Sequence, residues 1–410
     1  MTKSVRLIYF SQFYSPESIA GSFRAAENAS LWTKSGNQVH VFTGYPNYPT
    51  GKVFEGYNVK NLSIDIVDGI KVFRSKLSAV PNTSTINRLK NALSYYLYGR
   101  INTIFRDKNI WDSYDAVIGS SGPIFNALLA EKYAQKHKIP FIFDIRDINY
   151  VQMQATGRSA NTLSVRIMRA LELHLCKKAA KVVVVTNGFK EKLITEGISE
   201  TRIDVITNGV DVLPTPKSNI EGELVLSYFG TLGISQNISG TFEYSDYIHE
   251  LIPTTKYLII GEGAEKDRIV NLIAEKQYIE MKPGMSQEKL EPYYGTTSLS
   301  VIKLKNASQF RYTIPSKLFQ IMGRGIAVLY IGPEAECSSI INQNKAGICL
   351  TGTSEENKSI LKQFFSSNKW EQELETMGKN GRRAVEKDYT RTELANKYLE
   401  ILKRTIQTCK

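Results

Sequence analysis

Residues 310–329 read Phe-Arg-Tyr-Thr-Ile-Pro-Ser-Lys-Leu-Phe-Gln-Ile-Met-Gly-Arg-Gly-Ile-Ala-Val-Leu. Proline suits a first helical turn, because its φ is already helical and no N–H donor is needed there, so a helix is predicted to begin at Pro315 or Ser316. Two glycines end this helix, and the apolar run 326–331 is typical of a buried strand. Lys317 then falls in the first turn, where free N–H groups, the helix dipole and an ammonium predict a phosphate site. An ordinary helix–strand unit with a solvated lysine is the alternative.

The composition sets the frame for that site. The chain has 410 residues, which favours two domains over one, and its 42% of hydrophobic residues is enough for globular cores. No apolar run has the length of a membrane span, and the start of the chain predicts a first strand at 5–10 and no secretory signal, so we expect a cytoplasmic protein. The net charge of +12 favours phosphorylated substrates, anionic lipid or nucleic acid without deciding among them.

Metal and disulfide chemistry have little support. The cysteines and histidines are few and dispersed, with no paired spacing: Cys176, Cys337, Cys349, Cys409, His40, His137, His174 and His249. We therefore expect reduced thiols, no disulfide framework and no metal site.

The first half alternates strands and helices in the order of a Rossmann-type unit. A helix-like segment at 22–34 lies between strand patterns at 5–10 and 38–43. Ligands of such folds bind at the carboxyl ends of the strands, so the loop with Gly21 and Arg24 is a candidate wall of a cleft. Its glycine spacing is not Gly-x-Gly-x-x-Gly, which weakens a dinucleotide site.

Polar residues follow further strands of this half. Ser121 comes directly after the strand pattern at 116–120, and Arg146 and Asp147 end the next one. A charged pair at the end of a buried strand is costly unless it is used or paired, so Asp147 is a candidate site residue, with a structural ion pair as the alternative.

The loop at 44–51 combines turn formers with two aromatic residues at the same predicted edge. It contains Asn47 and Tyr48, and it predicts either stacking on a sugar or a rigid turn.

The segment 87–105 has the pattern of a basic amphipathic helix. Apolar residues and tyrosines at helical spacing alternate with Arg88, Lys90 and Arg100. Such a helix can lie on an anionic membrane, or it can cover a sheet with its outer face in solvent.

A proline-bearing segment at 212–218 interrupts the alternation and predicts a linker. We expect an acceptor-binding Rossmann-like domain at 1–212, a nucleotide-sugar-binding Rossmann-like domain at 213–385, and a C-terminal helix at 386–410 that packs back towards the first. The helical pattern near this end runs without a break from 377 to 402.

The second half repeats the strand–loop–helix order before Pro315. Strand patterns at 224–229 and 256–260 end in two glycine-containing loops, Gly230-Thr231-Leu232-Gly233 and Gly261-Glu262-Gly263. Glycine lets backbone N–H groups approach phosphate closely. Because the carboxyl ends of parallel strands share one edge, these loops and the Pro315 helix together predict a nucleotide crevice.

In order and spacing these motifs resemble the retaining glycosyltransferase family 4, nearly end to end, and within it the bacterial O-antigen and capsule transferases of the N-acetylfucosamine type. The motifs that carry the resemblance are 11–17, 44–52, 120–123, 146–148, 208–211, 230–233, 261–263 and 315–317. The resemblance implies an α/β protein of GT-B fold, in which two Rossmann-like parallel-sheet domains face a cleft. It implies that the second domain binds a nucleotide-diphosphate sugar and that the first binds the acceptor.

The activity implied is sugar transfer with retention, by hexosyl or N-acetylhexosaminyl transfer, from a UDP-linked donor to a lipid-linked glycan of surface polysaccharide. The candidate donor-binding residues are Gly230, Thr231, Gly233, Gly261, Gly263, Arg311, Ser316, Lys317 and Gln320. The candidate acceptor-binding residues are Arg24, Asn47, Tyr48, Ser121 and Arg146. Asp147, Lys317 and Gly21 are expected at the reacting centre.

The resemblance also implies catalysis without a metal or a cofactor. The chain has no Asp-x-Asp motif of the kind that holds a metal beside a diphosphate, and Lys317 with its helix end can offset the charge of the leaving group instead. The expected partners are the donor, the acceptor and an anionic membrane surface at the inner face of the plasma membrane. Nucleic-acid binding has only the net charge in its favour and is not expected.

One departure from the family leaves alternatives open. Family members commonly carry a Glu, seven residues and a second Glu, and the corresponding residues here are Tyr312 and Gln320. An amide can hydrogen-bond a ribose hydroxyl but cannot act as a carboxylate, which leaves open an unusual donor or a catalytically silent binding or scaffold subunit. A GT-B sugar-nucleotide epimerase is a further alternative. A nicotinamide oxidoreductase lacks its glycine fingerprint.

Overall fold

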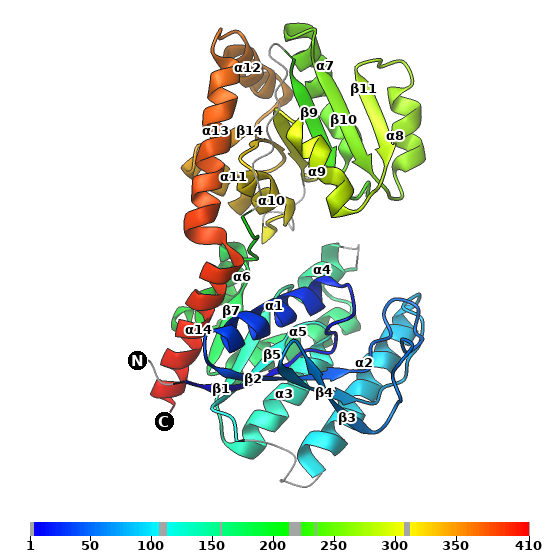
Figure 1. Cartoon of the computed structure of the whole chain (residues 1–410), viewed down its shortest axis with the longest axis vertical. Coiled ribbons are helices and arrows are strands. Elements are labelled where there is room, and N and C mark those ends of the chain that lie inside the picture. The colour runs from blue at the N-terminus through cyan, green and yellow to red at the C-terminus, as the bar shows by residue number, and fades with distance from the viewer. Residues whose placement is uncertain are drawn as a thin grey trace. The chain divides into compact units, whose positions relative to one another are not determined.

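The structure is a computed structural model that describes residues 4–105, 113–155, 158–212, 223–233, 236–306 and 312–409. The chain divides into two compact units, each with a sheet of its own (Figure 1). Unit 1 comprises Met1–Asn208 and Thr392–Lys410, and unit 2 comprises Gly209–Arg391. The predicted domain boundaries at 212/213 and 385/386 concern which parts of the chain fold independently, and they stay predictions.

The sheet of unit 1 has the strand order β3-β4-β2-β1-β5-β6-β7-β8. Its strands are β1 Arg6–Phe10, β2 Gln38–Gly44, β3 Leu62–Val67, β4 Ile70–Ser75, β5 Ala116–Ser120, β6 Phe141–Ile145, β7 Lys181–Val184 and β8 Ile203–Val205. Neighbouring strands are parallel except for the edge pair β3–β4, which is antiparallel. Asp68 and Gly69 join this pair, both at positive φ, as the tightest hairpin turns require.

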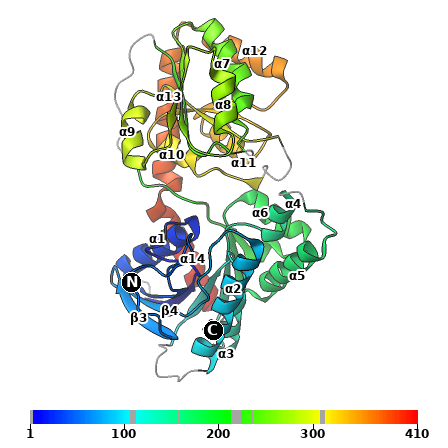
Figure 2. The same ribbon diagram turned by 90° about the vertical axis from the view of Figure 1, so that its right-hand side faces the viewer.

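The helices of unit 1 lie on both faces of its sheet. They are α1 Ala20–Lys34, α2 Thr85–Arg100, α3 Ile124–His137, α4 Asn149–Ala155, α5 Leu163–Lys178, α6 Asn187–Thr195 and α14 Arg391–Thr408. Right-handed crossovers that run in opposite directions along a sheet put their helices on opposite faces, so α1 lies on one face and α3 and α5 on the other. The helix α2 packs against α3 (Figure 2).

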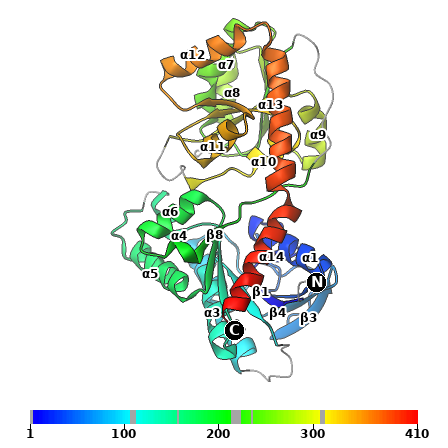
Figure 3. The same cartoon turned by 90° about the vertical axis from the view of Figure 1, so that its left-hand side faces the viewer.

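The C-terminal helix α14 shares the face of α1 (Figure 3). The indole N–H of Trp32 in α1 donates to the carbonyl of Ala395 at 2.8 Å, and the Trp32 ring meets the ring of Tyr398 edge-on. Both aromatic side chains are fully buried, so α14 contributes to the core of unit 1 although it ends the chain.

The sheet of unit 2 is entirely parallel, in the order β11-β10-β9-β12-β13-β14. Its strands are β9 Val225–Phe229, β10 Lys256–Gly261, β11 Ile279–Pro283, β12 Leu299–Lys303, β13 Ala327–Ile331 and β14 Gly347–Leu350. Its helices are α7 Phe242–Leu251, α8 Lys266–Ile273, α9 Gln287–Gly295, α10 Lys317–Gly323, α11 Glu336–Gln343, α12 Ser354–Phe365 and α13 Trp370–Ala384. The predicted fold class of two parallel-sheet α/β domains is confirmed, with the antiparallel edge strand β3 as an addition.

The prediction of one continuous helix at 377–402 is wrong. The helix α13 passes into a π-helical segment, Val385–Tyr389, and Thr390 is extended before α14 begins. Val210 pairs with this point, because its N–H donates to the Tyr389 carbonyl at 3.1 Å and its carbonyl accepts from the N–H of Arg391 at 3.2 Å. These backbone hydrogen bonds hold the chain extended where the periodicity alone favoured helix.

Within the part of the chain that the structure describes, no helix combines the length and apolar character that crossing a membrane requires.

Candidate functional site

Lys317 is the first residue of α10 in unit 2. The helix starts one residue after the predicted Ser316, although the Pro315 carbonyl already accepts from the N–H of Leu318 at 3.0 Å. The buried apolar face of α10 fixes the helix against the sheet. The Nζ of Lys317 donates to the hydroxyl oxygen of Tyr228 in β9 at 3.2 Å and lies 4.4 Å from the centre of that ring. The lysine is therefore held at the carboxyl end of β9.

Burial weakens the hold of this lysine on its proton. Desolvation lowers the pKa of Lys317 from its ordinary 10.5 to about 8. Among the described residues, no carboxylate pairs with its ammonium. A buried ammonium without a counter-ion is costly, and an anion bound beside it would relieve that cost. The surroundings of Lys317 therefore suit a phosphate group.

Glycine is required where Lys317 meets the loop after β9. A Cβ on Gly230, whose φ is +148°, would lie 1.8 Å from the lysine Nζ. A Cβ on Gly261 would lie 2.0 Å from the Gly230 carbonyl oxygen, and one on Gly263 would lie 2.4 Å from the carbonyl oxygen of Leu232. The predicted glycines thus let two loops and one lysine side chain occupy the same small volume.

Backbone hydrogen bonds fasten these two loops to each other. The N–H of Gly230 donates to the Ile260 carbonyl and that of Leu232 to the Glu262 carbonyl, each at 2.8 Å. The N–H of Glu265 returns to the Leu232 carbonyl at 2.9 Å. The structure therefore brings Gly230, Gly261, Gly263 and Lys317 together as predicted neighbours, while their binding of a donor stays a prediction.

The remaining predicted donor residues are less constrained. Thr231 and Ser316 are exposed, Gly233 and Gln320 are half-buried, and Arg311 lies outside the described residues.

A second desolvated lysine, Lys303, was not predicted as a site residue. It ends β12, the strand next to β9, and burial lowers its pKa. Its Cε lies 3.1 Å from where a Cβ on Gly240 would be, beside the amide of Asn237. The sequence signal was a lysine that closes the mostly apolar strand Leu299–Lys303.

Arg324 shows that a nearby basic residue can be wholly structural. Its side chain has no exposed surface, it forms an ion pair with Glu291, and its guanidinium lies 4.0 Å from the centre of the Tyr294 ring. No charge of Arg324 is left for a ligand, which separates it from Lys317.

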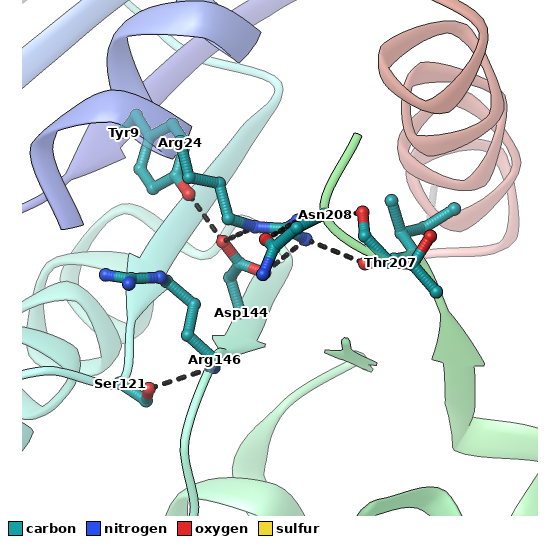
Figure 4. A network of polar contacts seen from close by, with 8 residues as sticks. Tyr9, Arg24, Ser121, Asp144, Arg146, Thr207 and Asn208 are labelled. Carbon is teal, nitrogen blue, oxygen red and sulfur yellow. Dashed lines mark hydrogen bonds and ion pairs between the residues drawn. The ribbon is translucent and has the colours of Figure 1, made fainter. Parts of the chain in front are cut away.

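In unit 1 a buried ion pair between Arg24 of α1 and Asp144 of β6 also contacts residues 206–208, at the end of the first stretch of the unit (Figure 4). The guanidinium of Arg24 donates to both carboxylate oxygens of Asp144, at 3.2 and 3.1 Å, and the Tyr9 hydroxyl donates to the same carboxylate at 2.5 Å. Burial by itself lowers the pKa of Arg24, but the Asp144 charge outweighs it and the pKa is raised.

The same guanidinium holds the last residues of the first stretch of unit 1. It donates to the carbonyl oxygens of Ile206 and Thr207 and to the side-chain oxygen of Asn208, at 3.2 to 3.3 Å. Arg24, predicted to bind the acceptor, therefore has protein partners for its guanidinium and lies buried among them. Its acceptor role stays a prediction.

Gly21, Ser121, Arg146 and Asp147 gather at the carboxyl ends of β5 and β6. A Cβ on Gly21 would lie 2.7 Å from the Arg146 Nη1, and the backbone N–H of Arg146 donates to the Ser121 hydroxyl at 3.1 Å (Figure 4). Asp147 is exposed; desolvation by the surrounding protein raises its pKa, and Arg146 acts in the opposite direction. These four predicted residues are brought together.

Sequence reasoning missed a carboxylate beneath Asp147. Glu172 in α5 is buried, and its oxygens accept from the N–H of Asn149 at 2.9 Å and from that of Tyr150 at 3.2 Å. Burial raises the pKa of Glu172 to about 7, and these hydrogen bonds oppose the rise. Because α4 begins at Asn149, Glu172 positions the turn that carries Asp147. A glutamate inside a helix gives no sequence signal for this role.

Asn47 and Tyr48 belong to a different polar cluster of unit 1. Their backbone N–H groups both donate to the buried carboxylate of Glu17 at 2.9 Å, and the Asn47 side-chain oxygen accepts from Asn91 of α2 at 3.0 Å. Burial raises the pKa of Glu17, and its backbone hydrogen bonds oppose the rise. In the described part of unit 1, no hydrogen bond or ion pair joins Asn47 or Tyr48 to Arg146.

Two further observations concern the rest of the described surface and possible metal ligands. A surface depression of about 500 Å³ lies at the opposite, amino-end edge of the unit 1 sheet, next to Thr33, Gln38 and Lys71, and contains none of the predicted residues. No group of three or more described His, Cys, Asp or Glu side chains is arranged to hold a metal ion.

Most of the first half of the chain matches a known protein family. Residues 24–212 match the model of Glycosyltransferase Family 4. Over this stretch the chain is similar to the family 4 glycosyltransferases. A comparison with curated proteins gave no match.

Solved structures resemble the whole chain. Sucrose-phosphate synthase from Thermosynechococcus elongatus superposes with a TM-score of 0.71 at 13% identity, over 99% of this chain and 100% of that one. Anabaena HepE in complex with UDP superposes with a TM-score of 0.63 at 12% identity, over 97% of this chain and 100% of that one. The lipopolysaccharide outer core galactosyltransferase WaaB in its apo form gives 0.60 at 13%, over 99% of each chain. At these identities the likeness shows the fold, which is GT-B. The family 4 domain within a GT-B chain supports a glycosyltransferase of the family 4 type.

Proposed function

We propose that the protein is a retaining glycosyltransferase that moves a sugar from a nucleotide-diphosphate sugar to a lipid-linked glycan. The proposed donor is UDP-linked, the transferred group is a hexosyl or N-acetylhexosaminyl unit of the N-acetylfucosamine type, and the product belongs to surface polysaccharide, O-antigen or capsule. One observation carries the donor part of this proposal: the desolvated ammonium of the half-buried Lys317 lies against Gly230 without a carboxylate partner among the described residues.

The comparisons support the choice of donor and acceptor class only by analogy. The HepE structure holds UDP, and WaaB is named as a lipopolysaccharide outer core galactosyltransferase. Both share the GT-B fold with this chain, and fold likeness alone does not fix a substrate.

In the proposed reaction the bond between the sugar's anomeric carbon and the diphosphate oxygen breaks, and the acceptor oxygen bonds to the same carbon on the same face. The leaving phosphate oxygen takes the proton of the acceptor hydroxyl, so no separate carboxylate base is needed. Lys317 stabilises the negative charge that develops on the leaving diphosphate without a metal, and the Gly230–Gly233 backbone approaches it. We propose that Gly21 and Asp147 of unit 1 act at the reacting centre.

Replacing Lys317 tests the proposal. Lys317→Ala is expected to weaken UDP binding and to lower turnover at least ten-fold, because a charge-assisted contact is worth roughly 1.5–3 kcal/mol. Calorimetry with UDP and turnover with UDP-sugars measure the two effects. Lys362→Ala is the matched control, because Lys362 is an exposed lysine of α12 in the same unit. It should behave as the wild type.

Three outcomes would contradict the proposal. Unchanged kinetics in Lys317→Ala would mean that the donor site is elsewhere. Turnover that depends on added magnesium would contradict the proposal that the reaction needs no metal. A wild-type protein that binds no nucleotide diphosphate would favour the silent binding or scaffold subunit, for which Gln320 in place of the family's Glu is the supporting observation.

A further inference from the structure

Helix α2 of unit 1 carries an apolar stripe that faces solvent. The residues of this α2 stripe, with their exposed fractions, are Ile86 (78%), Leu89 (52%), Leu93 (40%) and Leu97 (52%) in α2, and Ile101 (51%), which directly follows α2 as the first residue of a π-helical turn. They are three or four residues apart, so they follow one face of the helix, over about 22 Å at 1.5 Å per residue. Single exposed apolar residues are ordinary, but a continuous row of five marks an interaction surface.

The stripe cannot turn inward, because the opposite side of α2 is fixed in unit 1. Ala92, Tyr95 and Gly99 are buried there, and the Tyr95 hydroxyl donates to the Asn126 side-chain oxygen of α3 at 3.0 Å. A Cβ on Gly99 would lie 2.4 Å from a methyl group of Leu129, so the helix already touches α3 as closely as glycine allows. The exposure of the stripe is a property of the folded unit.

The charges on α2 all have one sign. Residues 85–105 contain Arg88, Lys90 and Arg100 and no aspartate or glutamate. Lys90 is exposed and follows Leu89 on the stripe, and the Arg100 guanidinium lies 5.8 Å from the centre of the Tyr96 ring. Apolar side chains, tyrosines and basic groups without acidic ones are the composition of helices that lie in the interface of an anionic bilayer.

We propose that the α2 stripe docks unit 1 on the surface of a bilayer that contains anionic phospholipid. A second copy of the chain fits less well, because a two-fold contact through the stripe would bury Lys90 and Arg100 of both copies with no acidic group of either helix to pair with them. The inference deepens the proposed function and rests on it for its purpose, since a lipid-linked acceptor lies at a bilayer surface. The docking itself can be measured without any turnover.

Sedimentation of the purified full chain with lipid vesicles tests the proposal. The wild type is expected to bind vesicles of phosphatidylcholine with phosphatidylglycerol at least ten-fold more strongly than vesicles of phosphatidylcholine alone. Leu93→Ser/Leu97→Ser should lower binding to the anionic vesicles at least ten-fold, and Lys90→Gln should lower it about five-fold. The matched control is Val270→Ser/Leu272→Ser, which removes two similarly exposed apolar residues from α8 of unit 2 and should bind as the wild type does.

Several results would overturn the inference. Equal binding of the wild type to neutral and anionic vesicles would overturn it. Wild-type binding of the Leu93→Ser/Leu97→Ser variant to anionic vesicles would overturn it as well. A dimer in ultracentrifugation that this variant abolishes, without vesicle binding by the wild type, would assign the stripe to a second copy. UDP calorimetry on the same samples keeps the two proposals apart: vesicle binding by a protein that binds no nucleotide would leave the docking surface in place and refute the proposed function.

Discussion

Lys317 shows how burial prepares a side chain for an anion. An exposed lysine would keep its charge beyond pH 10, whereas the surroundings of Lys317 lower its pKa to about 8. A phosphate beside it would restore the charged form, so proton uptake and anion binding are coupled. Arg24 and Arg324 differ from it, because their charges are already matched inside the protein by Asp144 and Glu291.

The coupling predicts a pH dependence. Only the protonated lysine attracts the diphosphate, so UDP affinity is expected to fall about ten-fold between pH 7 and pH 9. Lys317→Arg keeps its charge over this range and should show a flat profile, even if its affinity is lower. Calorimetry as a function of pH measures both. A flat wild-type profile, or the same fall in both proteins, would show that Lys317 does not meet the phosphate.

The same pKa has the opposite effect on stability. The unfolded chain holds the proton of this lysine up to about pH 10.5, whereas the folded protein releases it near 8. Between these values the unfolded state binds more protons, so the contribution of Lys317 to the free energy of unfolding increases with pH. Affinity and stability therefore change in opposite directions across this range.

At the scale of elements, the site of unit 2 depends on two strand-end loops that lie unusually close. The loop after β9 and the loop after β10 hydrogen-bond to each other, and glycines stand where any side chain would meet backbone or Lys317. The motif Gly230-Thr231-Leu232-Gly233 thus has a structural reason independent of any ligand, which is that it leaves room for the lysine.

A single methyl group at Gly230 should therefore disable the site. Gly230→Ala places a Cβ 1.8 Å from the lysine Nζ, so the lysine must leave its position, and UDP binding is expected to weaken at least ten-fold. Gly197→Ala is the control, since Gly197 has a φ of +83° and open space around its Cβ. It should lose about 1 kcal/mol of stability and no nucleotide binding. Calorimetry and denaturant unfolding measure the two quantities; wild-type affinity in Gly230→Ala would contradict this account of the loop.

At the scale of the whole molecule, each unit has a sheet and a buried core of its own. A ligand that binds one unit stabilises that unit directly, by about 2.7 kcal/mol at 100 times its dissociation constant. The proposed function assigns the nucleotide to unit 2 and leaves the acceptor to unit 1.

Hydrogen exchange of the full chain can locate the nucleotide. With saturating UDP, exchange is expected to slow most at the ends of β9 and β10 and at the start of α10, and least around Asp144 and Arg24 in unit 1. The Lys317→Ala protein should show little slowing at the same UDP concentration. Slowing centred on Glu17 and Asn47 would instead assign the nucleotide to unit 1.

Several features could be predicted from the sequence because they depend on neighbouring residues. The alternation of apolar runs with helical patterns gave two parallel-sheet α/β domains, and Pro315 and the glycines marked the ends of the helix that carries Lys317. The Asp68-Gly69 turn is equally local and was overlooked, although Asp-Gly between strand patterns is a strong hairpin signal.

Other features were decided only by tertiary structure, because they depend on which distant groups share a buried volume. Nothing near Arg24 in the sequence indicates that Asp144 lies against it, and nothing near Tyr389 indicates that Val210 will hold the chain extended there. The sequence by itself indicated that Lys317 lies in the first turn of a helix beside glycine loops. Its burial over Tyr228, and hence the charge it holds ready for an anion, came from the fold, since desolvation is set by everything that surrounds a group.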